Sequence, residues 1–143
     1  MRLFTSIILL LFAIRCFPQT YKDTIQCNND SPYFKVDTMP SFKGDGVDLF
    51  KKYIVQELHK SPVALESKKR GEIDIQFIIC QSGSLIEPKI VKGIDPKIDK
   101  KLLKILNNCP KWEPGLQNGK KVNVVYTQRI PVNFKLINSR KNN

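Results

Sequence analysis

The stretch that decides the fold is Pro110-Lys111-Trp112-Glu113-Pro114-Gly115. Pro110 lacks the backbone N–H that a helix interior needs, so it should end any helix before it. Trp112 is the only tryptophan, and because aromatic side chains chiefly supply buried area, a core or lid position is favoured. Pro114-Gly115 is typical of a turn. The stretch therefore predicts a junction between a helix and a strand, and none of its residues is typical of catalysis.

Residues 121–136 follow this junction and predict one long strand. Their even-numbered positions are apolar except for Gln128, and their odd-numbered positions are mostly polar. Such a strand has one face on a core and the other in water. The even-numbered residues are Val122, Val124, Tyr126, Gln128, Ile130, Val132, Phe134 and Leu136.

Two helices are predicted ahead of this strand. Asp95-Pro96 supplies a capping acid followed by proline at the first helical position, and apolar residues recur at helical spacing over 98–109 until Pro110. An earlier helix begins after Asp45, which is placed to cap it, and ends at Ser61-Pro62. Each helix has one apolar stripe, so both should pack on a core.

Two further strands, 72–80 and 85–91, are joined by the turn Gln81-Ser82-Gly83-Ser84. Proline cannot donate to a strand ladder and is confined to edges, ends or bulges. Pro88 lies in the second of these strands and Pro131 in the last strand of the chain, whereas 72–80 contains none. The strand 72–80 should therefore be central and the last strand an edge. The predicted fold is α+β, with two helices on one face of a three-stranded antiparallel sheet.

Residues 1–19 are typical of a secretory signal peptide. Arg2 precedes an apolar run that ends at Arg15, which is shorter than the about 20 residues of a membrane span. A signal-anchor and lipidation of Cys16 are the alternatives, and both would attach the protein to a membrane. We therefore expect an exported protein, periplasmic or associated with the cell envelope. The remaining chain should comprise a polar lead-in, one domain and a disordered tail, at 20–35, 36–137 and 138–143.

The charge of the chain does not indicate a nucleic-acid partner. The formal net charge of +11 falls by two, to +9, when Arg2 and Arg15 leave with the signal peptide. Export argues against nucleic acid, and the lysines are spread along the chain as on a solvated surface. Attraction to anionic envelope surfaces or acidic partners is the alternative.

The cysteines and the single histidine suit structure better than catalysis. Cys80 ends the central strand and Cys109 ends the second helix, so a Cys80–Cys109 disulfide would join helix to sheet, although sequence does not fix connectivity. His59 and scattered cysteines do not form a zinc site, so no metal or cofactor is expected. A cysteine nucleophile would need His59 beside it, and no catalytic motif is present, so a binding module is expected rather than an enzyme.

The last strand is the candidate partner-binding site. Proteins usually blunt an exposed edge strand, but an extended peptide can also add to it as a further strand. On the residues alone, a protected edge and a docking edge are equally supported. The docking edge would consist of Val122, Val124, Tyr126, Gln128, Ile130, Val132 and Phe134.

The motif at 110–115 is part of a longer pattern. Its continuation is Gly119-Lys120-Lys121-Val122 and Pro131-Val132-Asn133-Phe134. Weaker matches precede it at Met39-Pro40-Ser41-Phe42-Lys43-Gly44, Ser61-Pro62, Ala64, Gly71, Ser82-Gly83 and Gly93-Ile94-Asp95-Pro96. Together these residues resemble the TonB C-terminal domain family over 36–136. Asp45 stands where a second glycine is common, and Ser61 where tyrosine is usual.

The resemblance implies the fold of TonB and TolA C-terminal domains and a non-enzymatic, periplasmic role in energy-dependent transport. Family members pair their last strand with an extended segment of an outer-membrane TonB-dependent receptor, which places the docking edge here within 122–134. The residues Pro110, Lys111, Trp112, Pro114 and Gly115 would then be structural.

The resemblance also leaves an alternative function open. A working transducer has a membrane anchor and a long spacer, and at about 3.5 Å per residue the lead-in at 20–35 is expected to be too short to cross the periplasm. The alternative is an envelope adaptor or lipoprotein that uses the same fold for other protein partners. Pairing of the edge between two copies would give a homodimer.

Overall fold

The computed structural model describes Cys27 and residues 29–67 and 69–134. The predicted signal peptide, with the lipidation site at Cys16, lies outside the described residues, as does the predicted tail at 138–143. The elements in chain order are α1 (Gly46–His59), α2 (Pro62–Glu66), β1 (Arg70–Ile79), β2 (Leu85–Lys92), α3 (Pro96–Asn107), β3 (Gly115–Gln117), β4 (Lys120–Val122) and β5 (Val124–Asn133).

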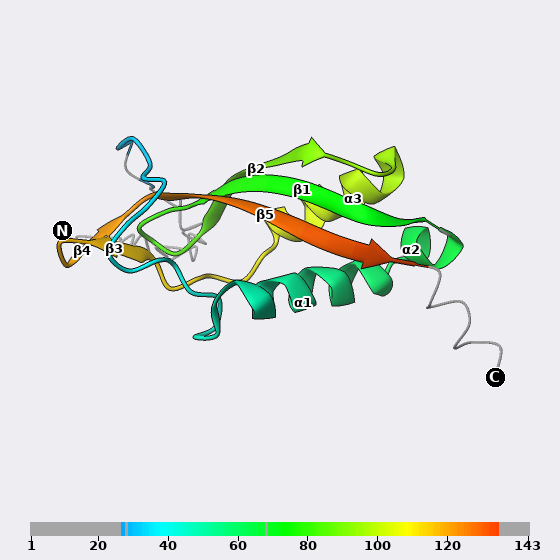
Figure 1. Cartoon of the computed structure of the whole chain (residues 1–143), viewed down its shortest axis with the longest axis horizontal. Helices are drawn as coiled ribbons and strands as arrows, with labels where there is room; N and C mark the ends of the chain where they lie inside the picture. Colours follow the sequence, from blue (N-terminus) through cyan, green and yellow to red (C-terminus); the bar gives the residue numbers. More distant parts are fainter. Residues whose placement is uncertain (1–26, 28, 68, 135–143) are drawn as a thin grey trace, which may run out of the picture.

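Strands β2, β1 and β5 form an antiparallel sheet with β1 in the middle. This confirms the strand order predicted from the prolines, because Pro88 lies in β2 and Pro131 in β5, the two outer strands. Helix α1 contacts β5, α3 contacts β2, and the two helices contact each other (Figure 1). The predicted α+β arrangement of helices packed on an antiparallel sheet is therefore confirmed.

The core lies between the helices and the sheet. The odd-numbered side chains of the central strand, from Ile73 to Ile79, are fully buried, whereas Glu72, Asp74 and Gln76 lie on the opposite face. This alternation follows from the two-residue period of a strand. Phe50, Ile54, Leu58, Ile98, Leu102 and Leu106 complete the core from α1 and α3.

The two predicted helix caps behave differently. Asp95 caps α3 as predicted, because its side chain accepts hydrogen bonds from the N–H groups of Lys97 and Ile98. Asp45 occupies the N-cap position of α1, but its side chain makes no capping bond. Its backbone, at φ −118° and ψ 17°, is not in the extended conformation that a capping side chain usually requires. The Ser41 hydroxyl instead accepts from Gly46 N–H at 3.3 Å.

A third helix, α2, begins where only a helix end was predicted. The α1 helix does end at His59, but Ser61 then serves as the N-cap of α2, and its hydroxyl accepts from Ala64 N–H. Pro62 occupies the first turn of α2, where a missing N–H costs nothing. The Ser-Pro pair therefore separates two helices rather than ending one.

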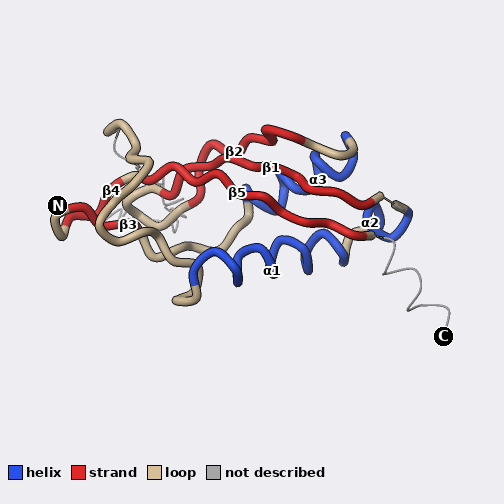
Figure 2. The backbone as a smooth tube through the Cα atoms, in the orientation of Figure 1, coloured by secondary structure: helices blue, strands red, loops and turns tan. Residues whose placement is uncertain are grey.

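The long strand predicted at 121–136 is wrong as a single element. Its first residues belong to a separate hairpin, in which β4 pairs with β3. The turn of this hairpin is Asn118-Gly119, and both residues have positive φ, 51° and 74°, as a tight hairpin turn requires. Figure 2 shows this small hairpin at one end of the molecule and α2 at the other. The break before β5 falls at Asn123, whose side chain is buried and bonds to Gln81 N–H and the Asp30 carbonyl.

The predicted Cys80–Cys109 disulfide is not the one in the structure. Cys80 is bonded to Cys27, 53 residues away with a Cα–Cα distance of 5.6 Å, and Cys109 is a free thiol. The reason is the alternation of β1. Its even-numbered positions face away from the helices, and Cys80 continues that series, whereas Cys109 follows α3 on the helical side.

Candidate functional site

The edge of β5 that faces away from β1 is the candidate site. At its beginning, Tyr33 runs parallel to it: Val125 N–H donates to the Tyr33 carbonyl and Tyr33 N–H donates to the Asn123 carbonyl, both at 2.8 Å. Successive residues of a strand direct their backbone groups to opposite sides. The odd-numbered residues of β5 therefore point their N–H and C=O groups outward.

The even-numbered residues of β5 bond to β1. Phe134 N–H continues this pattern by donating to the Lys69 carbonyl at 3.1 Å. Pro131 is odd-numbered, so its missing N–H removes no bond from the ladder with β1. Among the described residues, the outward N–H and C=O groups of Thr127 and Arg129, and the Pro131 carbonyl, have no strand partner.

The side chains predicted for the docking edge lie mostly on the core face. Val122 is in β4, apart from the others. Gln128 is half-buried, and the remaining five are buried: Val124, Tyr126, Ile130, Val132 and Phe134. Their side chains are therefore unavailable, and a partner strand would meet the backbone of the odd-numbered neighbours instead. Sequence reasoning missed Thr127 and Arg129, although Pro131 marks the odd-numbered positions as the outward ones.

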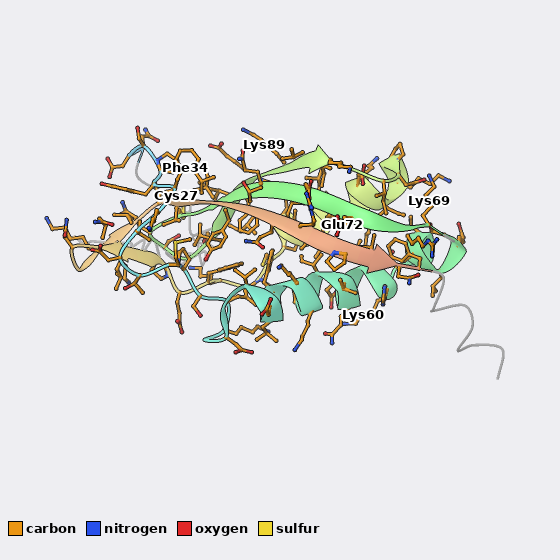
Figure 3. All side chains as sticks on the ribbon, viewed as in Figure 1. Cys27, Phe34, Lys60, Lys69, Glu72 and Lys89 are labelled. Carbon is orange, nitrogen blue, oxygen red and sulfur yellow. A yellow bond between two sulfur atoms is a disulfide. The ribbon has the colours of Figure 1, made fainter. Side chains whose placement is uncertain are left out.

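Arg129 is held over the outer face of the sheet. Its guanidinium binds the Asp74 carboxylate through two nitrogens, at 2.8 and 3.3 Å, and Glu72 lies 3.5 Å away. Hydrogen bonding to Arg129 lowers the pKa of Asp74, and the same contact raises the pKa of Arg129. Because this side chain reaches back across β1, it leaves the backbone of Arg129 accessible at the edge. Figure 3 labels Glu72 on this face.

One flank of α1 lies beside the open edge. Tyr53 and Glu57, on the other flank, face α3, where they share a shallow hollow with Lys101. At 100° per residue, Val55 lies on the flank away from α3, and it is a half-buried apolar side chain packed on the core. A strand added to β5 would therefore lie near this apolar side chain as well as against backbone groups.

The motif at 110–115 supports the end of the sheet where β5 begins. The Trp112 side chain is buried, since the residue is only 3% exposed, and the backbone N–H of Trp112 donates to the Gly83 carbonyl at 2.7 Å. Glu113 exchanges two backbone bonds with Ser41, and Gly115 begins β3. The rings around Trp112 are those of Phe50 at 4.9 Å, Phe42 at 5.3 Å, Tyr126 at 5.4 Å and Phe77 at 5.8 Å.

The groups that would serve catalysis lie apart from one another. Burial raises the pKa of the Cys109 thiol to about 11, so this sulfur is protonated and a poor nucleophile at neutral pH. The ring of His59 packs edge-on against Phe134, and Cys80 is in a disulfide. Within the described part of the chain, no three His, Cys, Asp or Glu side chains are grouped to hold a metal ion.

These features define a small α+β domain whose last strand has an outer edge that is open beyond Val125 in the described chain, and whose core contains one tryptophan surrounded by aromatic rings. Residues 61–136 match the family described as the Gram-negative bacterial TonB protein C-terminal. Because the match includes more than half of the chain, this protein belongs to the TonB C-terminal family. The family consists of envelope-associated protein-interaction domains that serve energy transduction in transport. No curated protein and no solved structure matches the chain.

The matched region begins at residue 61, yet the residues before it belong to the same core. Phe42 is fully buried beside Trp112, and the Pro40 carbonyl accepts a hydrogen bond from Tyr126 O–H at 2.9 Å.

None of the helices in the described residues is long and apolar enough to cross a membrane.

Proposed function

We propose that this domain binds extended segments of outer-membrane receptors by strand addition at residues 127–131 of β5, as a step in energy-dependent transport. The observation that carries the proposal is the row of outward backbone groups at Thr127, Arg129 and Pro131 that lack a strand partner in the described chain. Main-chain bonds to such an edge supply affinity, and side chains at alternate positions supply specificity.

The other outer strand is less suited to this role. Glu87 in β2 has a positive φ of 48°, and the pairing of β2 with β1 shifts register between Gln76 and Ile78. Pro88 and Lys89 follow directly. Bulges, prolines and lysines are the usual means by which proteins protect an edge from pairing. The β2 edge therefore has the features of a protected edge, and β5 is the better docking strand.

The docking stretch sets the size of the partner. Five residues of strand at about 3.4 Å each span about 17 Å, so a short extended segment is sufficient. The partner would be extended, would donate to the carbonyls of Thr127, Arg129 and Pro131, and would accept from Thr127 and Arg129 N–H. Opposite Pro131 it would find no donor, so we expect the strongest pairing near Thr127.

A titration with receptor peptides tests the proposal. Isotope-labelled protein is mixed with extended peptides from outer-membrane receptors, and the amide signals of Thr127 and Arg129 are expected to shift. Thr127→Pro removes the outward N–H but no bond to β1, so it should abolish the shifts while circular dichroism shows a folded domain. Thr127→Ala is the matched control, because both variants lose the 3.4 Å contact from Gln76.

Two outcomes would count against receptor docking at this edge. Receptor peptides that bind Thr127→Pro as tightly as the unaltered protein would place the site elsewhere. Shifts at Thr127 with unrelated extended peptides, but none with receptor peptides, would favour an envelope adaptor with other partners.

We also propose that the protein acts in the periplasm or attached to the envelope, after export. The support is the family assignment together with the signal-like residues 1–19. Mass analysis of the mature N-terminus distinguishes the alternatives: cleavage near Gln19 indicates secretion, an acylated Cys16 indicates a lipoprotein, and an intact Met1 indicates a signal-anchor.

A further inference from the structure

Cys27 and residues 29–33, here called the N-terminal segment, cross the end of the sheet where β5 begins. The Cys27–Cys80 disulfide attaches one end of this segment next to the β1–β2 turn. Its other end, Tyr33, takes the first outward position on the β5 edge through bonds to Asn123 and Val125. Figure 2 shows the loop passing over this end of the sheet, and Figure 3 labels Cys27 and Phe34 there.

Polar contacts hold this segment between its two ends. The buried Asn123 carboxamide donates to the Asp30 carbonyl at 3.1 Å and accepts from Gln81 N–H at 3.2 Å. Apolar burial contributes little, because Tyr33 is 45% exposed and residues 29–31 are exposed as well. A segment that is held by a few hydrogen bonds and one covalent bond depends strongly on the covalent bond.

The position of Tyr33 is the position that an added strand would occupy. It accepts from Val125 N–H and donates to the Asn123 carbonyl, which are the first outward groups of the edge. Any partner strand on β5 must therefore begin beyond Val125 while the N-terminal segment is bound. Release of the segment would lengthen the accessible edge by the Asn123 carbonyl and the Val125 N–H.

We infer that the N-terminal segment is an internal competitor for the start of the docking edge, and that thiol–disulfide exchange at Cys27–Cys80 controls whether it stays there. A thiolate of a dithiol reductant attacks one sulfur, the S–S bond breaks, and the other cysteine leaves as a thiolate. The second thiol of the reductant then resolves the mixed disulfide. The protein gains two electrons and two protons, and the reductant becomes a disulfide.

Hydrogen exchange of the free protein tests the first half of the inference. In the oxidised protein the Val125 amide should be protected, and after reduction by a dithiol, or in Cys27→Ser/Cys80→Ser, it should exchange at least about tenfold faster, since its acceptor is lost. The Tyr126 amide, which bonds to β1, should keep its rate. Cys109→Ser should change neither amide.

Either of two results would overturn the inference that the disulfide holds the N-terminal segment on the edge of β5. An unchanged Val125 rate after reduction would show that the segment stays bound without the disulfide. Equal acceleration of Val125 and Tyr126 would show that the disulfide stabilises the whole domain and does not act on the segment alone.

The second half rests on the proposed function and is tested with the same receptor peptides. In the oxidised protein the peptide footprint should begin at Thr127, and in the reduced protein it should extend to Val125, with a lower Kd. Identical footprints in both states would overturn this half. Absence of any peptide binding would instead refute receptor docking, while the exchange rates of Val125 would still decide the role of the disulfide.

Discussion

Gly83 lies in the β1–β2 turn directly against the backbone of Trp112. Its φ is +80°, in the region that favours glycine, and a Cβ at this position would collide with the Trp112 carbonyl. Gly119 has a similar φ of +74°, but a Cβ there would meet no atom within 4 Å. The two glycines therefore separate the effect of backbone conformation from the effect of close approach.

Gly83→Ala is expected to destabilise the domain considerably more than Gly119→Ala. The left-handed conformation alone costs about 1–2 kcal/mol for a non-glycine residue, and Gly119→Ala should show only that cost. Gly83→Ala must in addition displace the bond from Trp112 N–H to the Gly83 carbonyl. Urea unfolding followed by circular dichroism measures both variants, and equal losses would contradict the close approach.

His59 gives the domain a pH dependence in mildly acidic solution. Burial lowers the pKa of His59 below its usual 6.5, and its Nε2 is buried without a hydrogen-bond partner among the described residues. Below pH 6.5 the unfolded chain binds the proton more readily than the folded one, so the free energy of unfolding should fall as the pH drops from 6.5 towards 5.

The measurement is the urea midpoint as a function of pH for the unaltered protein and for His59→Phe. Phenylalanine keeps a ring against Phe134 and removes the ionisable group, so its midpoint should stay level over the same interval. Asp74 and Asp95 titrate at lower pH because their pKa values are lowered. A level profile in the unaltered protein would refute the assignment to His59.

At the scale of elements, the two N-caps provide a matched pair. Asp95 accepts two backbone hydrogen bonds at the start of α3, whereas the side chain of Asp45 makes none at the start of α1. Asp95→Ala should therefore lower the Tm by several degrees and Asp45→Ala should change it little, since only the first leaves helical N–H groups without an acceptor. Similar Tm values for the two variants would contradict this assignment of the caps.

The elements that sequence predicted well are those specified by local chemistry. Pro88 and Pro131 indicated the outer strands, and Asp95-Pro96 indicated the start of α3, because proline and capping residues act within a few positions of themselves. The Asn118-Gly119 pair is also a strong hairpin signal. The turn was not predicted, because the alternation across 121–136 favoured one long strand.

Contacts between distant residues were not predictable in the same way. The alternation of β1 already put Cys80 on the face away from the helices, which argues against Cys109 as its partner, but nothing local indicated Cys27. Tyr33 and the start of β5 are about 90 residues apart in the chain, and they pair through backbone atoms only. No pattern of side chains in the sequence therefore predicts this pairing. The helix α2 is too short for periodicity to reveal.

For the whole molecule, the limited open edge predicts a monomer. Antiparallel pairing of two β5 strands could join Thr127 to Arg129 of a second copy, but the next pair would oppose Val125, already bonded to Tyr33, to Pro131, which has no N–H. Such a ladder would contain fewer backbone bonds than an added peptide makes, and it would have to hold two folded domains together. Sedimentation analysis at micromolar concentrations should give the monomer mass, and a concentration-dependent dimer would show that Tyr33 can be displaced by a second copy.

The Cys27–Cys80 bond also determines how the domain would respond to mechanical load. A force that pulls on the chain ahead of Cys27 enters the fold at Cys80, next to the end of the central strand, and bypasses the residues between them. Helices α1 and α2 are then shielded from tension while the bond is intact. The 53-residue separation removes about 180 Å from the length that stretching can release. Oxidised and reduced molecules pulled by their termini should therefore differ in extension by that amount. The redox state of this cysteine pair would then determine how far the whole domain can be stretched.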